Sequence, residues 1–223
     1  ELRDSDFTRA DLSGADLSGT ESFNAIFLNA NLAGANLTDA LMGSAVLAGA
    51  DLSGAVINGA SLASTTSNGF TAAQLYSTAS YQSRDLNRVY LASNNHSGWN
   101  FGHTDLTGAT FNNSILIEAN LKGSTLVGAS MTGADLTSAN LVGADLTAAN
   151  LTNANLTGTA LNLATVNGAN LNSITDSGFT AGQFYSTASY QSGMLSDMDL
   201  VFYFSAFVNY FYFIKMNAVS IFL

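Results

Sequence analysis

The chain has 223 residues, and its composition is that of a folded protein with few charges. A hydrophobic fraction of 47% supplies an ample core and excludes general disorder. The absence of cysteine excludes a disulfide framework, a thiolate metal site and cysteine catalysis. Six Lys and Arg against 16 Asp and Glu give a net charge of −10, which argues against direct binding of nucleic acid.

A hydrophobic residue recurs at every fifth position along most of the chain. The first run has one exception, Ser22, and comprises Leu2, Phe7, Leu12, Leu17, Phe27, Leu32, Leu37, Met42, Leu47, Leu52, Ile57 and Leu62. The second run has one exception, His96, and comprises Leu86, Leu91, Phe101, Leu106, Phe111, Leu116, Leu121, Leu126, Met131, Leu136, Leu141, Leu146, Leu151, Leu156, Leu161, Val166 and Leu171. A small residue, usually alanine, stands two places before most members of both runs.

A period of five suits neither common secondary structure. On an α-helix these residues would wind around the axis, because five residues advance the chain by roughly 500°. On a flat strand they would alternate between the two faces. The period works if each unit forms one side of a coil, so that about four units close a coil of about 20 residues and coils stack roughly 4.8 Å apart. The recurring hydrophobic residue and the small residue before it then point inward.

The remaining positions of the unit agree with this geometry. The place before the hydrophobic residue holds Asp in some units, as at Asp11, and Asn in others, as at Asn31. These residues share an acceptor oxygen but not a charge, which indicates a role in hydrogen-bonding backbone N–H groups at turns. The place two after the hydrophobic residue is often glycine, as at Gly14, which a tight corner favours.

Units such as Ala-Asp-Leu-Ser-Gly at 10–14 and Ala-Asn-Leu-Thr-Asp at 35–39 resemble the A(D/N)LXX motif of the pentapeptide-repeat family. The resemblance covers about 1–62 and 84–171. It implies an all-β fold, a right-handed quadrilateral β-helix, here carrying two short α-helical inserts. It says little about function.

Two segments that interrupt the repeat are copies of each other. Residues 69–83 and 178–192 agree at 13 of 15 positions, at an offset of 109 residues. Thr71 with Gln74 forms a capping box, and Phe70 with Leu75 forms a hydrophobic staple. The second copy repeats both motifs with Thr180, Gln183, Phe179 and Phe184. Each insert is therefore predicted to form a helix of about two turns, and such inserts resemble those of bacterial members of the family.

The inserts also supply the candidate interaction surface, which consists of Tyr76, Tyr81, Tyr185 and Tyr190. One interpretation is that these rings bind a protein partner. The other, which we favour, is that the helix covers one flank of the coil and the rings pack there, since the staple already commits the apolar residues of the insert to packing.

The predicted organisation has five parts, namely repeat coils at 1–66, a helical insert at 67–83, further coils at 84–175, a second insert at 176–192 and a divergent aromatic tail at 193–223. Three interpretations of 201–223 are left open: packing over the open end of the β-helix or self-association into a homo-oligomer, membrane contact, and non-native sequence. The repeat is in register at Leu2 and the first residue is Glu1, so we expect a truncated or processed N-terminus. Localisation, including secretion, is left open.

Catalytic motifs are scarce. His96 replaces a hydrophobic residue of the repeat in a stretch that reads as a loop, and His103 falls on an outward position. We expect both to be structural or surface residues rather than catalytic or metal-binding ones, and we predict no cofactor and no metal. Carboxylates occur singly on the coil faces, so no acid–base pair is indicated.

The sequence is best interpreted as a non-catalytic scaffold that binds an unidentified protein. The alternative is a DNA mimic that binds a DNA-processing enzyme such as gyrase, because the family resemblance extends to quinolone-resistance proteins of that kind. The net charge suits mimicry, but residues 20 apart on one face, such as Asp16, Asn36 and Val56, form no continuous acidic stripe. Binding to ice or another flat surface is disfavoured because the stacked threonines form only the pairs 132/152 and 137/157.

Overall fold

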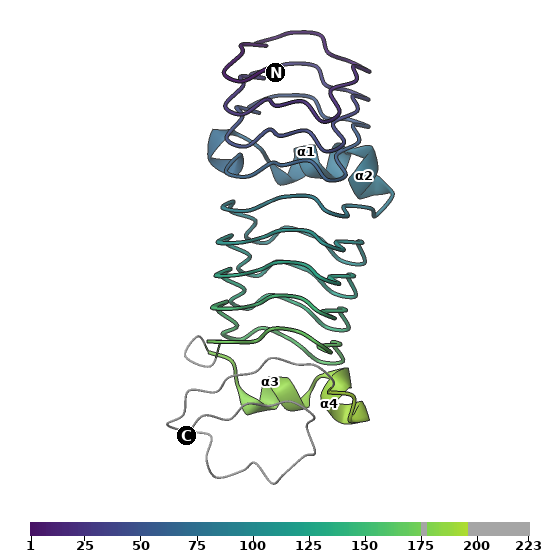
Figure 1. Cartoon of the computed structure of the whole chain (residues 1–223), viewed down its shortest axis with the longest axis vertical. Helices are drawn as coiled ribbons and strands as arrows, with labels where there is room; N and C mark the ends of the chain where they lie inside the picture. Colours follow the sequence, from purple (N-terminus) through teal and green to yellow (C-terminus); the bar gives the residue numbers. More distant parts are fainter. Residues whose placement is uncertain (175–177, 196–223) are drawn as a thin grey trace.

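The computed structural model describes residues 1–174 and 178–195, which form a repeat β-helix of coils stacked along one axis (Figure 1). Neighbouring coils are joined by parallel bridges between residues 20 positions apart, such as Asp11 with Asn31 and Asp16 with Asn36. The bridges recur every five residues, so the repeat unit defines the sides of a coil as the periodicity predicts. Within the described residues each β-pairing is an isolated bridge rather than a longer strand.

Each unit makes several backbone hydrogen bonds to the next coil and closes one turn. The Leu12 N–H donates to the Asn31 carbonyl at 2.8 Å, and the Ala15 N–H donates to the Leu12 carbonyl at 3.0 Å. The turn residue two after Leu12 has a positive φ of 65° at Gly14, and at some corners a non-glycine residue, such as Ala148 at φ 56°, adopts the same conformation. The predicted preference for glycine at the corner is confirmed, because this conformation strains other residues.

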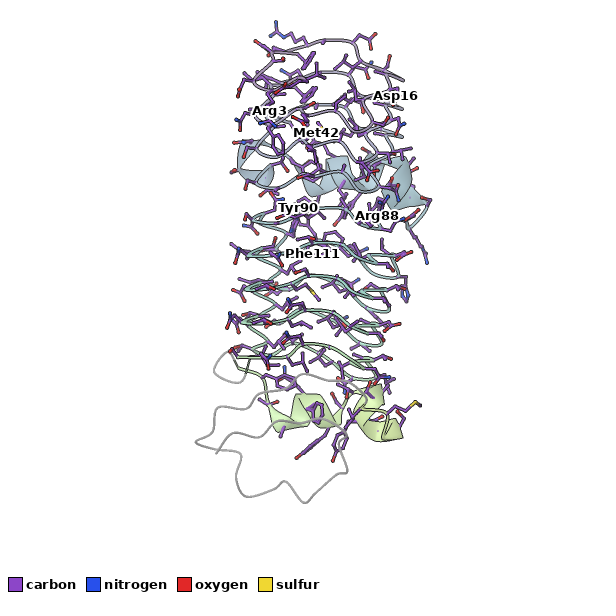
Figure 2. The ribbon with its side chains drawn as sticks, viewed as in Figure 1. Arg3, Asp16, Met42, Arg88, Tyr90 and Phe111 are labelled. Atoms are coloured by element: carbon purple, nitrogen blue, oxygen red, sulfur yellow. The ribbon has the colours of Figure 1, made fainter. Side chains whose placement is uncertain are left out.

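The recurring hydrophobic residues fill the interior of the coils. Met42 and Phe111 lie inside with at most 1% exposure, whereas Arg3 and Arg88 lie on the outside (Figure 2). Burying one such side chain contributes about 1.5–3 kcal/mol before the entropy of ordering is counted. Hydrophobic residues of the first coil, such as Leu12, are only half-buried because the described coils cover them on one side.

The helices lie at two levels of the stack (Figure 1). The first level holds the short 3-10 helix η1 (Thr66–Asn68) with helices α1 (Ala72–Ser77) and α2 (Ala79–Gln82). The second level holds α3 (Ala181–Tyr185) and α4 (Ala188–Ser192).

Each insert thus contains two very short helices where the sequence predicts one. The break occurs at Thr78, whose extended backbone (ψ 148°) ends α1 while its side chain accepts a hydrogen bond from the Tyr81 N–H and starts α2. In the second insert, α3 ends at its C-cap Ser186, and the side chain of Thr187 accepts a hydrogen bond from the Tyr190 N–H and starts α4. A threonine is a good N-cap, so it favours a restart over a continuous helix.

The first insert replaces part of a coil rather than lying on its flank. Ser61 bridges directly to Tyr90, 29 positions later, so the insert lengthens one coil by nine residues without breaking the stack. The Gly54 N–H donates to the Ser77 carbonyl at 2.8 Å, in the place of a coil-to-coil bond. Phe70 and Leu75, at 2% and 0% exposure, continue the hydrophobic core through this level.

The sequence expectations for 201–223 lie outside the described residues. Among the residues that are described, none of the helices has the length and apolar character needed to cross a lipid bilayer.

Candidate interaction surface

Each insert brings two tyrosine rings together. The ring centroids of Tyr76 and Tyr81 are 4.6 Å apart at an interplanar angle of 31°, and those of Tyr185 and Tyr190 are 4.7 Å apart at 38°. All four rings are half-buried and pack against the core. The two pairs lie at different levels of the stack, one on α1–α2 and one on α3–α4 (Figure 1). The sequence-predicted residues therefore form two separate aromatic pairs rather than one cluster.

The first pair is tied to the coil that follows it. The Tyr76 hydroxyl accepts a hydrogen bond from the Asn100 N–H at 2.6 Å, and the Tyr81 hydroxyl donates to the Asn100 carbonyl at 2.9 Å. Burial raises the pKa of the Tyr81 phenol, and the neighbouring Tyr76 adds to this effect while Arg84 opposes it. The two hydroxyls thus take the place of the backbone groups of a regular preceding coil, with which Asn100 would otherwise form hydrogen bonds.

The second pair packs on its own insert. The Tyr190 ring lies 5.3 Å from the Phe184 ring, and the Tyr185 ring lies 6.3 Å from it. Neither hydroxyl makes a hydrogen bond with the part of the chain that the structure describes. In residues 1–174 and 178–195 the second pair is therefore held by ring packing alone, unlike the first.

A glutamine anchors each insert to the preceding coil. The Gln74 side-chain oxygen accepts from the Thr71 N–H at 2.8 Å, and its nitrogen donates to the carbonyls of Leu47 and Ala50 at 2.7 and 2.9 Å. Gln183 makes the corresponding bonds to Leu156 and Thr159. The capping boxes predicted from the sequence are confirmed in both inserts, and the same glutamines fix the helices in place.

The two histidines occupy unrelated places. His96 is enclosed at 0% exposure in regular coil rather than in a loop, and its ring lies among Trp99, Phe101 and Phe111. Burial lowers the pKa of His96 to about 3, and neither ring nitrogen has a hydrogen-bond partner. His103 is exposed. Within the described residues no group of three or more His, Asp or Glu side chains could hold a metal ion.

The outward-facing carboxylates accept hydrogen bonds from backbone N–H groups of the turns. One Asp11 side-chain oxygen accepts from the Ser13 N–H at 3.1 Å, and the Asn31 side-chain oxygen accepts from the Ala33 N–H at 3.0 Å. Where this place holds Asp or Asn, the prediction that the acceptor oxygen matters rather than the charge is confirmed, although other units hold an apolar residue such as Val46 there. The hydrogen bonds from Ser13 hold the pKa of Asp11 below its usual value, and Asn31 also donates to that carboxylate at 3.0 Å. Amide side chains such as Asn31 therefore separate the carboxylates on one side of successive coils, such as Asp11 and Asp51.

Sequence reasoning did not single out Trp99 and Asn100 as partners of the first insert. Trp99 lies 5.8 Å from Phe70, ring to ring, and Asn100 holds both tyrosines. A signal for Trp99 was present, because it stands in the place two before Phe101 that other units give to a small residue.

The family model described as pentapeptide repeats matches the chain in eight copies, over residues 1–21, 25–64, 85–123, 114–153 and 139–173. No curated protein is significantly similar to the chain.

Several solved structures are similar. The pentapeptide repeat protein HetL, involved in heterocyst differentiation regulation in the cyanobacterium Nostoc sp. strain PCC 7120, is 32% identical, with 75% of this chain and 73% of that one covered and a TM-score of 0.33. The plasmid-mediated fluoroquinolone resistance protein QnrB1 is 19% identical over 86% of this chain and 85% of its own, with a TM-score of 0.42. The pentapeptide repeat protein Rfr23 from the cyanobacterium Cyanothece 51142 is 22% identical over 67% and 85%, with a TM-score of 0.27.

Proposed function

The chain belongs to the pentapeptide-repeat family, and from this premise we propose that it is a non-catalytic scaffold that binds another protein. The coil is taken to be right-handed and four-sided, as family membership implies. The recurrence of bridges every five residues with a coil period of 20 supports four sides.

The observation that carries the proposal is the second tyrosine pair. Tyr185 and Tyr190 present half-buried rings whose hydroxyls have no hydrogen-bond partner among the described residues. Aromatic side chains with an apolar body and a polar tip are enriched at protein interfaces. The partner surface should therefore be apolar at its centre and offer hydrogen-bond acceptors or donors to the two phenols.

A catalytic role is not proposed. The His96 ring is enclosed in the core and His103 lies on the outside, so the two cannot act on one substrate. Outward-facing carboxylates such as Asp11 accept hydrogen bonds from turn N–H groups. A general acid or base must itself lie within hydrogen-bond reach of the proton that it transfers.

Site-specific photo-crosslinking tests the scaffold. A photoreactive residue is placed at Gln191, exposed on α4, and the matched control is placed at Gln82 on α2, where the tyrosines are engaged. We expect one defined protein to be crosslinked from 191, and we expect the crosslink to disappear in the variant Tyr190→Ala. A crosslink that is equal from both positions, or unaffected by Tyr190→Ala, would contradict the proposal.

DNA mimicry is the competing function. It gains from the net charge of −10, but Asn31 separates Asp11 from Asp51 and donates a hydrogen bond to Asp11. A gyrase supercoiling assay distinguishes the two functions. Inhibition of supercoiling by a stoichiometric amount of the protein, if it is lost when Asp11 and Asp51 are both changed to Asn, would support DNA mimicry instead of the scaffold function.

A further inference from the structure

A pocket lies where the first insert meets the coil that follows it. Its volume is about 610 Å³, within the range of roughly 300–1,000 Å³ that is usual for small-molecule sites. The walls of the pocket come from η1 and the start of α1 in the insert, and from residues between 93 and 115 in the coils. The lining residues that matter below are Phe70, Ser93, Asn95, Trp99 and Asn113.

Trp99 gives the pocket a fixed aromatic wall. It stands at a corner position that is Ala119 and Ala139 in the next two coils on the same side, so the tube itself has no need of a large ring there. Its ring packs against Phe70 at 5.8 Å and against His96 at 4.7 Å. The Phe101 ring lies nearly parallel to it at 6.3 Å, so three rings hold the half-buried indole in one orientation while it lines the pocket.

The polar groups around this ring are uncharged and available. The Asn113 side chain makes no hydrogen bond within the described residues, nor do the Ser93 hydroxyl, the Asn95 side-chain nitrogen and the Trp99 indole N–H. Ser93, Asn95 and Asn113 are exposed at the rim. The lining contains no Asp, Glu, Lys, Arg or His. An ionic ligand would find no partner of opposite charge here.

We infer that this pocket binds a neutral sugar residue stacked on Trp99. A pyranose ring has apolar C–H faces that suit an aromatic surface, and hydroxyl groups at its edge that suit amides and hydroxyls. The pocket offers both in one place. The sugar can be a free disaccharide or a residue of a polysaccharide, and the chemistry of recognition is the same for both.

Trp99 is the single tryptophan of the chain, so its fluorescence reports directly on the pocket. The full chain is titrated with maltose, cellobiose and diacetylchitobiose, and with glucuronic acid as the charged probe. We expect a saturable change with at least one neutral disaccharide, confirmed by calorimetry, and affinity for glucuronic acid weaker by about tenfold or more. Retardation in gels containing amylose, hydroxyethylcellulose or glycol chitin then separates a polysaccharide ligand from a free one.

Two variants assign the binding to the pocket. Trp99→Ala is expected to fold, because alanine occupies the same corner in neighbouring coils, and to weaken calorimetric binding by about tenfold or more. Trp99→Phe keeps a flat ring and should retain most of the affinity. If Trp99→Ala fails to fold, a variant of a rim residue, Asn113→Gly, decides.

Asn113→Gly removes the free amide while keeping the positive φ of 55° unstrained. Its matched control is Asn153→Gly, because Asn153 has φ 58°, is exposed and lies on the same side two coils further on. We expect loss of affinity in the first and none in the second. The inference is overturned if none of the saccharides binds, if glucuronic acid binds as well as the neutral sugars, or if both asparagine variants bind like the parent.

Discussion

The two inserts have nearly the same sequence and the same internal bonds, but different neighbours. In both, a threonine–glutamine capping box opens the first helix, and the glutamine nitrogen holds two carbonyls of the preceding coil. Below the first insert, Asn100 binds the hydroxyls of Tyr76 and Tyr81. Among the described residues nothing plays this part for the second pair.

The difference shows that an insert's shape is local while the role of its tyrosines is not. Helix starts depend on side chains within three residues of each other, so a copied segment copies its fold. A tyrosine hydroxyl, in contrast, is satisfied by whichever coil lies next to it. The two nearly identical segments are therefore tied to the following coil through their tyrosines in one place, and have tyrosine hydroxyls without a partner among the described residues in the other.

The largest expected effect tests the inward and outward positions assigned in the coils between the two inserts. Leu141→Lys places an ammonium group at a position with 0% exposure, and its burial without a partner should lower the free energy of unfolding by about 5 kcal/mol or more. Thr137→Lys, at an outward position, should cost about 1 kcal/mol, because it loses the hydroxyl bond to Asp135. Thermal melting of both variants checks this, and equal shifts would show that the inward and outward faces are wrongly assigned.

Acid should act on the coil next to the first insert through His96. Burial lowers the pKa of the folded-state imidazole to about 3 from 6.5, so the unfolded chain binds the proton more readily between these values. Stability is therefore unaffected above about pH 6.5 and falls by about 1.4 kcal/mol per pH unit as the pH drops towards 3. At about pH 5 the loss is about 2 kcal/mol.

Denaturant unfolding at several pH values measures this slope. His96→Leu should abolish it, whereas His103→Gln, which changes an exposed histidine, should leave it intact. The lowered pKa of carboxylates such as Asp11 adds a separate loss below about pH 3.8, so the slope that belongs to His96 is measured between about pH 6.5 and about pH 4. A slope that survives in His96→Leu would show that another group is responsible.

The capping boxes should contribute equally in the two inserts. Thr71→Ala and Thr180→Ala each remove the side-chain acceptor of the first helical turn, at a cost of about 1 kcal/mol. Hydrogen exchange of the amides at Gln74 and Gln183 should accelerate to a similar degree. Clearly unequal acceleration would mean that the copied segments do not share a local fold.

The smallest expected change in stability tests the difference between the two tyrosine pairs most directly. Tyr76→Phe removes a hydroxyl that accepts the Asn100 N–H, and should cost about 1 kcal/mol. Tyr185→Phe removes a hydroxyl without a partner among the described residues and should cost nothing measurable in the free protein. Paired melting curves decide it, and a larger loss for Tyr185→Phe would reverse the roles given to the two pairs.

Most of the coil could be predicted from the sequence because its rule is local and repeated. Each turn needs a residue that tolerates positive φ, as at Gly14, and many turns also use an acceptor oxygen, as at Asp11, and both occur within one unit. The single-helix prediction for the inserts was wrong, because Thr78 caps a second helix where a continuous one was expected. A threonine inside a helical pattern fits both outcomes until its backbone conformation is known.

By itself, the sequence determined which side chains point inward, where the turns fall and how each insert begins, since all three depend on residues within one or two units. Only the tertiary structure decided that Asn100 meets the first tyrosine pair, that His96 is sealed among aromatic rings, and that Trp99 borders a pocket. The contacts of Asn100 and Trp99 with the insert cross the level where Ser61 pairs with Tyr90, and the insert's nine extra residues shift the stacking there away from the period of 20. Periodicity fixes neighbours only where the coil length is constant.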